Sequence, residues 1–278
     1  MNRRTFMQSA TGAISGVFAG CTGTAGEQQK TWLMPEEGEP HRRTWMAFTA
    51  SERIWGPDLP RVRRDLATIV TTIARFEPVS MLVRAEDLEQ ARSLLGSSAV
   101  ELVTAELDDL WLRDTGPVFV RERGALDFNF TSWGGKQEYR RDAKVAGFVA
   151  QRTGAERVRT DLVLAGGTLE VDGEGTAIIT ESCVLNGNRN RGWHKRDVEE
   201  ELERLRGTRK MIWLPGIAGR DITDGHTDST STPGSQVLAW RWPGWTTTPS
   251  RTTTTSRAAI WRSCARPRTP AAGRCGSR

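Results

Sequence analysis

Apolar residues recur with a helical spacing in four parts of the chain. The longest is residues 61–76, where five apolar side chains share one helical face: Val62, Leu66, Ile69, Val70 and Ile73. This helix is expected to stop before Pro78. Shorter helices are predicted over residues 86–95, 141–153 and 194–205.

Short apolar runs between these helices predict strands. Single strands are expected at residues 79–83, 100–103, 162–164 and 210–214. Two further pairs of runs flank turns that contain Gly, and these predict hairpins at residues 117–120 with 126–130 and at 169–171 with 177–180.

The order of these elements repeats along the chain. In each round a helix leads to a strand, then to a polar loop, then to two strands. Units that cannot bury their own apolar face gain a core by packing against their neighbours. The pattern therefore predicts a radially repeated α/β assembly over residues 31–228. The third round does not continue beyond Asp228 with the strand pair that the pattern demands.

Residues 229–278 differ in composition from the rest of the chain. They contain eight Arg and no Lys, Asp or Glu. Removing these from the 39 basic residues leaves 31 against 34 acidic ones, so residues 1–228 carry a net charge of −3 although the whole chain carries +5. The Arg residues are scattered among Thr, Pro, Ala and Ser rather than grouped with aromatics on a folded basic face, which argues against nucleic-acid binding.

Two explanations of this low-complexity tail are open. A genuine disordered extension would explain its lack of apolar periodicity. Four Trp and two Cys are unusual for such an extension, and all acidic residues are lost at one point. Translation in a changed reading frame is the favoured interpretation, so that the tail is not native sequence of the fold.

The N-terminus carries a pattern typical of export and lipidation. Arg3-Arg4-Thr5-Phe6-Met7 resembles a twin-arginine signal, and Phe18-Ala19-Gly20-Cys21 resembles a lipoprotein cleavage site at which the Cys21 sulfur accepts a lipid. The alternative is a flexible N-terminus with incidental arginines. The apolar run between the two motifs is too short to span a membrane as a helix. Residues 1–21 are predicted to be a signal and residues 22–30 a linker, so the protein is expected outside the cytoplasm on a lipid anchor.

Three polar segments are not explained by apolar periodicity: residues 108–117, Gly166-Gly167 and residues 224–228. Each follows a strand of a successive round, and a repeated fold brings such loops together at one end. Carboxylates and a His suit a planar cationic substrate, because a guanidinium presents five donors in a fixed fork that carboxylates accept in pairs. His226 and Asp228 share a face of an extended segment. A His can carry protons for departing ammonia and incoming water.

Other roles for these residues are open. Asp114 precedes Thr115, Gly116 and Pro117 and could cap a turn. His226 with Asp228 could belong to a metal site, but they fall short of the usual three or four ligands, and no metal or cofactor is predicted. Cys183 follows an apolar run and is expected to behave as a small buried hydrophobe.

Several ordered motifs over residues 31–228 resemble the agmatine deiminase branch of the guanidine-modifying enzymes. Two of them are Asp109-Leu110-Trp111-Leu112-Arg113-Asp114-Thr115-Gly116-Pro117 and Asp224-Gly225-His226-Thr227-Asp228. The others follow in family order at residues 34–46, 128–135, 173–176 and 185–190.

The resemblance implies a five-bladed pseudo-symmetric α/β propeller, the pentein fold, which would be incomplete here. It also implies a thiol mechanism without a cofactor: a cysteine thiolate attacks the guanidinium carbon, ammonia leaves with a proton from His226, and water releases a ureido product. Agmatine would give N-carbamoylputrescine, whereas related bacterial peptidylarginine deiminases convert arginine to citrulline. Asp114 and Asp228 would grip the guanidinium, and further substrate-binding candidates are Asp108, Asp109, Trp111, Arg113, Gly166 and Gly167.

The chain departs from the family pattern at two places. The family usually carries Glu immediately before Gly166-Gly167, where this chain has Ala165. The family nucleophile ends a Gly-rich segment with His-Cys, and neither Cys264 nor Cys275 has that context. No nucleophile is identified, so we expect a deiminase-like hydrolase with impaired activity. The alternatives are a peptidylarginine deiminase-like protein, a non-catalytic exported lipoprotein that binds a guanidinium, and a nonfunctional product of a damaged gene.

Overall fold

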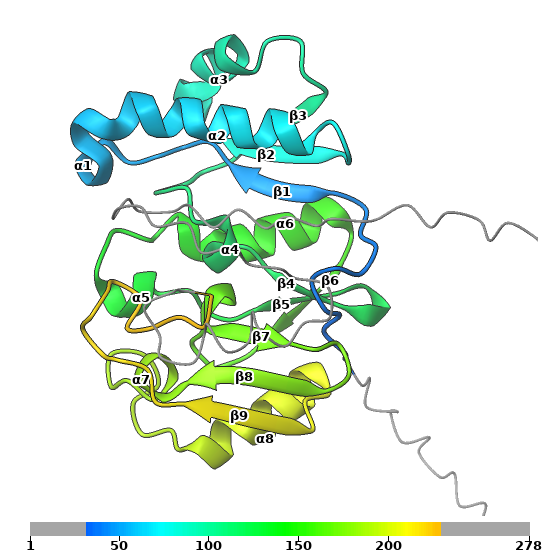
Figure 1. The fold of residues 1–278 in the computed structure, drawn as a ribbon, viewed down its shortest axis with the longest axis vertical. Coiled ribbons are helices and arrows are strands. Elements are labelled where there is room, and N and C mark those ends of the chain that lie inside the picture. The colour runs from blue at the N-terminus through cyan, green and yellow to red at the C-terminus, as the bar shows by residue number, and fades with distance from the viewer. Residues whose placement is uncertain (1–31, 229–278) are drawn as a thin grey trace, which may run out of the picture. The chain divides into compact units, whose positions relative to one another are not determined.

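The computed structural model describes residues 32–228, apart from the side chains of Glu122 and Arg206 (Figure 1). The predicted signal with Cys21, the linker and the tail after Asp228 lie outside the described residues. Within the described part, nine strands form three sheets of three strands each, and no closed sheet is formed.

The first sheet is entirely parallel. It contains β1 (Thr44–Ala47), β2 (Val79–Val83) and β3 (Val100–Thr104) in that order. Parallel neighbours need a crossover connection, and helices α2 (Leu59–Ile73) and α3 (Leu88–Leu95) provide it. The short helix α1 (Glu52–Trp55) precedes α2.

The second and third sheets share a different plan, in which a hairpin is followed by a helix and then by a strand. The hairpin of β4 (Val118–Val120) and β5 (Gly124–Asp127) leads to α6 (Val145–Thr153), and β6 (Glu156–Arg159) returns parallel to β5. The third sheet repeats this order with β7 (Leu169–Val171), β8 (Thr176–Thr180), α8 (Lys195–Arg206) and β9 (Lys210–Leu214). Single helical turns lie between these elements: α4 (Leu112–Thr115), α5 (Ser132–Gly135) and α7 (Glu181–Val184).

The predicted helices and hairpins are present, with ends shifted by a few residues, but three details of the prediction are wrong. Strands β1 and β6 were not expected. Leu162 and Leu164 are buried, but residues 162–164 are not a strand, because the amide and the carbonyl of Val163 bind the Asn190 side chain, at 2.8 and 2.9 Å, instead of a neighbouring strand. The repeat unit also begins at a different place than predicted. The strands after helices α6 and α8, β6 and β9, pair with the hairpin that precedes the helix.

Helices and sheets alternate in layers through the described part. One face of the first sheet packs against α2 and α3, and its other face packs against Val145 and Val149 of α6 (Figure 1). Apolar residues of the second and third sheets share one core with α8, which contributes Val198, Leu202 and Leu205. Helix α6 thus joins the first and second sheets, and α8 joins the second and third. No helix among residues 32–228 is long and apolar enough to cross a membrane.

Candidate functional site

The three polar segments meet at Gly167. If Gly167 had a Cβ atom, that atom would lie 2.5 Å from both His226 Nδ1 and Asp228 Oδ2 and 2.9 Å from Asp114 Oδ1. His226 Nδ1 lies 3.7 Å from a carboxylate oxygen of Asp114 and 3.7 Å from one of Asp228. Each segment follows the last strand of its sheet, β3, β6 or β9. The repeat therefore brings residues more than a hundred positions apart into one small volume.

Asp114 is fixed by donors from two other segments. It lies on the single turn α4 and is buried. The Gly167 amide donates to its Oδ1 at 2.9 Å, and the Trp133 indole donates to its Oδ2 at 3.1 Å. A carboxylate has about four acceptor positions, so both oxygens keep capacity for a further donor. The sequence allowed Asp114 to be a turn cap, but its carboxylate faces His226 instead.

His226 lies in a buried carboxylate environment. Burial by itself would lower its pKa, but Asp114, a hydrogen bond with Cys183 and the charge of Asp228 raise the pKa to about 9. The imidazole is therefore protonated at neutral pH and can donate a proton. Its own backbone N–H is held by Thr223 Oγ1 at 3.0 Å.

Asp228 is the more exposed of the two carboxylates beside His226. Burial raises the pKa of Asp228 to about 6, the His226 imidazolium opposes this rise, and Asp114 adds to it. Its backbone N–H donates to the Gly167 carbonyl at 3.3 Å, and the Thr227 hydroxyl donates to the same oxygen at 3.1 Å. The Gly167 backbone thus binds both the Asp114 side and the His226–Asp228 side of the site.

Arg113 and Gly166 directly precede Asp114 and Gly167 in the sequence, and they contact each other. The Arg113 guanidinium pairs with Glu37 from the opening motif and lies 3.7 Å from Glu170 of β7. Burial would lower the pKa of Arg113, but these two carboxylates raise it. Gly166 lies directly against the Arg113 carbonyl, where a side chain would collide. These contacts join the segments that carry Asp114 and Gly167.

Asp108 and Asp109 bind backbone groups away from His226. Asp109 accepts the Ser51 amide and the Trp55 indole, at 3.2 and 2.9 Å. Asp108 accepts the amides of Arg141 and Asp142, and Asp142 in turn accepts the amides of Asp108 and Asp109. This reciprocal arrangement fastens the loop that leads to Asp114 onto the start of α6.

Aromatic rings form one wall beside Asp114. The rings of Trp55 and Trp111 are 5.9 Å apart, and Trp133 lies edge-on to both Trp111 and Phe130. Ala165 is buried in this aromatic cluster, so the wall is apolar at this position.

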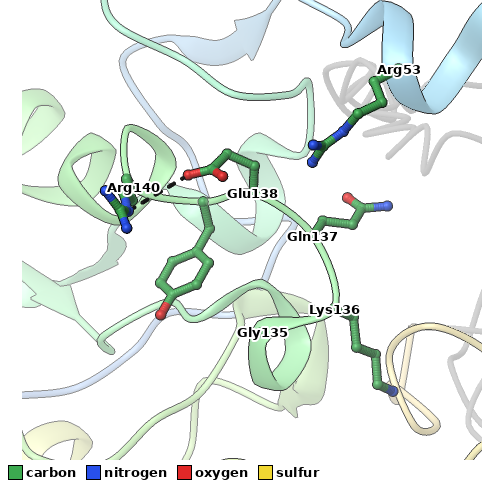
Figure 2. A pocket seen from close by; sticks show the side chains of 7 residues that line it. Arg53, Gly135, Lys136, Gln137, Glu138 and Arg140 are labelled. Carbon is green, nitrogen blue, oxygen red and sulfur yellow. Dashed lines mark ion pairs between the residues drawn. The ribbon is translucent and has the colours of Figure 1, made fainter.

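An open hollow of about 490 Å³ is lined by Arg53 and residues 135–140, and this lining includes none of Asp114, His226 and Asp228 (Figure 2). Three of its lining side chains are cationic, those of Arg53, Lys136 and Arg140, and Glu138 adds a carboxylate that pairs with Arg140. Tyr139 lines the hollow and also packs against the aromatic cluster. The hollow is thus lined by the segment that follows Trp133 in the sequence.

Cys183 has a position that the sequence did not reveal. It is buried as expected, with an exposed fraction of 1%, but it lies 3.4 Å from Thr168 Oγ1 and forms a hydrogen bond with His226. The apolar periodicity of the sequence predicted only that Cys183 is buried. It could not predict the contacts with Thr168 and His226, because these residues come from other segments of the chain. In residues 32–228 no group of three or more His, Cys, Asp or Glu side chains is arranged to hold a metal ion.

Comparison with known proteins places the chain in a family. The sequence profile of the Porphyromonas-type peptidyl-arginine deiminases matches residues 33–260, which is most of the chain. The chain belongs to this family. The match includes the segments of Asp114, Gly167 and His226, and it extends past Asp228.

Curated relatives of this family member are named agmatine deiminases. The agmatine deiminase of Stutzerimonas stutzeri is 38% identical over 230 residues, which is 78% of this chain and 62% of the relative. The enzyme of Pseudomonas aeruginosa is 38% identical over 221 residues, covering 74% of this chain and 60% of the relative. The chain thus spans about three fifths of the length of these relatives.

Solved structures show the same fold. The agmatine deiminase of Enterococcus faecalis has a TM-score of 0.68 and 28% identity, over 71% of this chain and 57% of the other. The C. jejuni agmatine deiminase with substrate bound has a TM-score of 0.64 and 26% identity, over 72% of this chain and 60% of the other. The described sheets and helices are therefore those of an agmatine deiminase over that shared part.

Proposed function

We propose that residues 32–228 form the guanidinium-binding part of an agmatine deiminase-type hydrolase, which converts agmatine to N-carbamoylputrescine and ammonia. The observation that carries this proposal is the meeting of Asp114, His226 and Asp228 around Gly167. The names of the relatives support the same reaction class.

The site has the charge and shape that a guanidinium needs. Asp114 and Asp228 flank His226, and both have acceptor positions for the N–H groups of a planar cation. Gly167 presents no side chain to the two carboxylates, and a Cβ at this position would collide with both of them. The guanidinium would lie between the two carboxylates, with its central carbon exposed to a nucleophile.

The chemistry assigns two proton transfers to His226. A thiolate forms a C–S bond with the guanidinium carbon, and the C–N bond to one terminal nitrogen breaks as the protonated His226 gives that nitrogen the proton with which ammonia leaves. The neutral imidazole then takes a proton from water, whose oxygen attacks the same carbon. The C–S bond then breaks, the thiolate is regenerated, and the hydroxyl proton of the intermediate passes to solvent to leave the neutral ureido product.

The thiol for this reaction lies outside residues 32–228 in our proposal. Cys183 is buried behind His226 and packs against Thr168, so a substrate cannot reach its sulfur. Cys264 and Cys275 lack the Gly-rich His-Cys context of the family. We therefore infer impaired turnover in this chain, and a protein that only binds the guanidinium is the second candidate function.

We also propose that the three described sheets belong to a five-bladed propeller. Two of the three sheets are covered on both faces, the first by α2, α3 and α6, the second by its own helix α6 and by α8. On the third sheet, Ile179 and Trp213 face α8, so the alternation of the strands turns Ile178, Ile212 and Leu214 to the other face. Ile212 is 36% exposed. A further unit with its own helix would cover this face.

Export and lipidation are also proposed, on the basis of the N-terminal motifs. Growth with a labelled fatty acid should mark the wild-type protein and leave Cys21→Ala unmarked. Equal labelling of the two proteins would rule out the lipid anchor.

The proposed activity is tested by joining a family C-terminal segment with the Gly-rich His-Cys motif after Asp228. The extended protein should release ammonia and ureido product, whereas the present chain should show little or none. Agmatine, free arginine and an arginine-containing peptide serve as parallel substrates. Asp114→Asn in the extended protein should weaken binding and turnover, because a neutral amide lacks the charge that pairs with the guanidinium. If the extended protein ignores all three substrates, the proposed function is wrong.

A further inference from the structure

One ion cluster outside the guanidinium site joins residues of two family motifs with a residue that directly follows a third. Asp224 begins the motif of His226, Arg189 belongs to the motif at residues 185–190, and Lys136 follows the motif that contains Trp133. Arg189 Nη1 donates to Asp224 Oδ2 at 2.8 Å, and Lys136 Nζ donates to the same oxygen at 2.7 Å. The side chains of Arg189 and Asp224 are only 3% and 4% exposed. Water therefore screens this cluster weakly.

The two cations also hold the backbone that precedes Asp224. Arg189 Nη2 donates to the Thr223 carbonyl at 2.7 Å, and Lys136 Nζ donates to the Ile222 carbonyl at 2.9 Å. Figure 2 shows Lys136 extending away from the other residues of the hollow, toward this loop. One cation from each of two segments thus binds both the side chain and the main chain of the His226 loop.

The backbone at Asp224 needs such support. Its φ angle is +64°, a left-handed conformation that is unfavourable for most residues with a side chain. The Asp224 carbonyl accepts the Ser182 hydroxyl at 2.6 Å, and the Gly225 carbonyl accepts the Thr180 hydroxyl at 2.6 Å. His226 follows two residues after Asp224, so this turn sets the direction of its side chain.

The cluster is connected to the Asp114 side of the site as well. Trp133, which donates its indole N–H to Asp114, lies three residues before Lys136. Gly134 lies so close to the Asn188 side chain that no Cβ could fit between them, and Asn188 precedes Arg189. The segment that fixes Asp114 is therefore packed against the segment that fixes Asp224.

We propose that Asp224, held by Arg189 and Lys136, is a positioning residue that sets the distance of the His226 imidazole from Asp114 and Asp228. The inference rests on the proposed function, because it concerns the reacting group of that site. Burial alone would raise the pKa of Asp224, but hydrogen bonds from Lys136 and Arg189 lower it to about 2. The cluster is consequently charged over the whole pH range in which His226 titrates.

The test measures the pKa of His226 by NMR in the ligand-free full-length chain, which has three His residues, so that His41 and His194 serve as internal references. Arg189→Lys keeps the net charge but loses the planar fork that binds Asp224 and Thr223 together. Its His226 pKa should fall by about one unit, because the ring moves away from the carboxylates that raise it. Lys136→Met should cause a smaller fall. Arg196→Ala, which breaks the exposed pair with Glu200, should cause none.

The readout separates positioning from simple loss of charge or of fold. Asp224→Asn removes a charge and therefore cannot separate positioning from loss of charge. The decisive variant is Arg189→Lys, and its thermal unfolding checks that it is folded. If Arg189→Lys does not fold, Lys136→Met is used instead, because the Lys136 side chain is only partly buried. An unchanged His226 pKa in the folded variants would overturn the proposal. A wild-type chain that binds no agmatine would instead refute the proposed function and leave this measurement valid.

Discussion

Gly167 is the residue at which the site depends on the absence of a side chain. Its backbone binds Asp114, Thr227 and Asp228, while the space above its Cα is filled by His226 and the two carboxylates. A methyl group at this point would need the buried charged groups to move apart. The close packing of protein interiors leaves little room for that.

Gly167→Ala should therefore weaken agmatine binding by at least about tenfold, equivalent to about 1.4 kcal/mol, with the fold retained. Calorimetric titration of the full chain measures this. The matched control is Gly187→Ala, because no atom lies within 4 Å of a Cβ at Gly187. Equal affinity of the two variants would show that the space at Gly167 is unimportant.

The titration of His226 gives a second prediction at the residue scale. Its pKa is raised from 6.5 to about 9 in the folded chain. The stability that this shift contributes is complete below pH 6.5 and is lost as the pH rises through 9, by roughly 1–3 kcal/mol. Denaturant unfolding of the wild type and of His226→Gln, compared at pH 6 and pH 9.5, checks this. The difference in unfolding free energy between the two proteins should shrink at the higher pH.

At the scale of elements, helix α8 is the layer that joins the second and third sheets. Val198, Leu202 and Leu205 are fully buried in a core that contains residues of both sheets. Leu202→Ala should lower the free energy of unfolding by about 2–5 kcal/mol. Glu203→Ala on the exposed side of the same helix should change it by less than about 0.5 kcal/mol. Urea unfolding followed by circular dichroism measures both, and similar losses would contradict this packing.

The elements also show what the sequence could and could not predict. Helix α2 and the two hairpins follow from apolar spacing, because each buries a regular apolar face. Strand β6 has Val158 as its one apolar residue, and its pairing with β5 depends on distant contacts, so the nearby buried run at residues 162–164 was mistaken for it. The family motifs predicted Asp114, His226 and Asp228 as site residues, whereas the contacts of Cys183 and Asp224 join segments that lie far apart in the sequence.

At the scale of the whole molecule, the face of the third sheet that points away from α8 tests the proposed five-bladed fold. The chain spans about three fifths of the curated relatives, and the third sheet turns Ile178, Ile212 and Leu214 away from α8. Ile212→Lys should change the stability of the present chain by less than about 0.5 kcal/mol. In the protein extended by a family C-terminal segment, the same change should cost more than about 2 kcal/mol, because it would bury an unpaired charge. Equal effects in the two proteins would contradict a covering unit.

The central claim is that Asp114 and Asp228 bind a guanidinium beside His226. The most direct measurement is titration of the full chain with agmatine, followed through the NMR signals of the His226 imidazole, with putrescine as the matched ligand that lacks the guanidino group. Agmatine should bind saturably and shift the His226 signals, putrescine should not, and Asp114→Asn should weaken agmatine binding by at least about tenfold. Equal responses to the two ligands, or unchanged affinity in Asp114→Asn, would contradict the account.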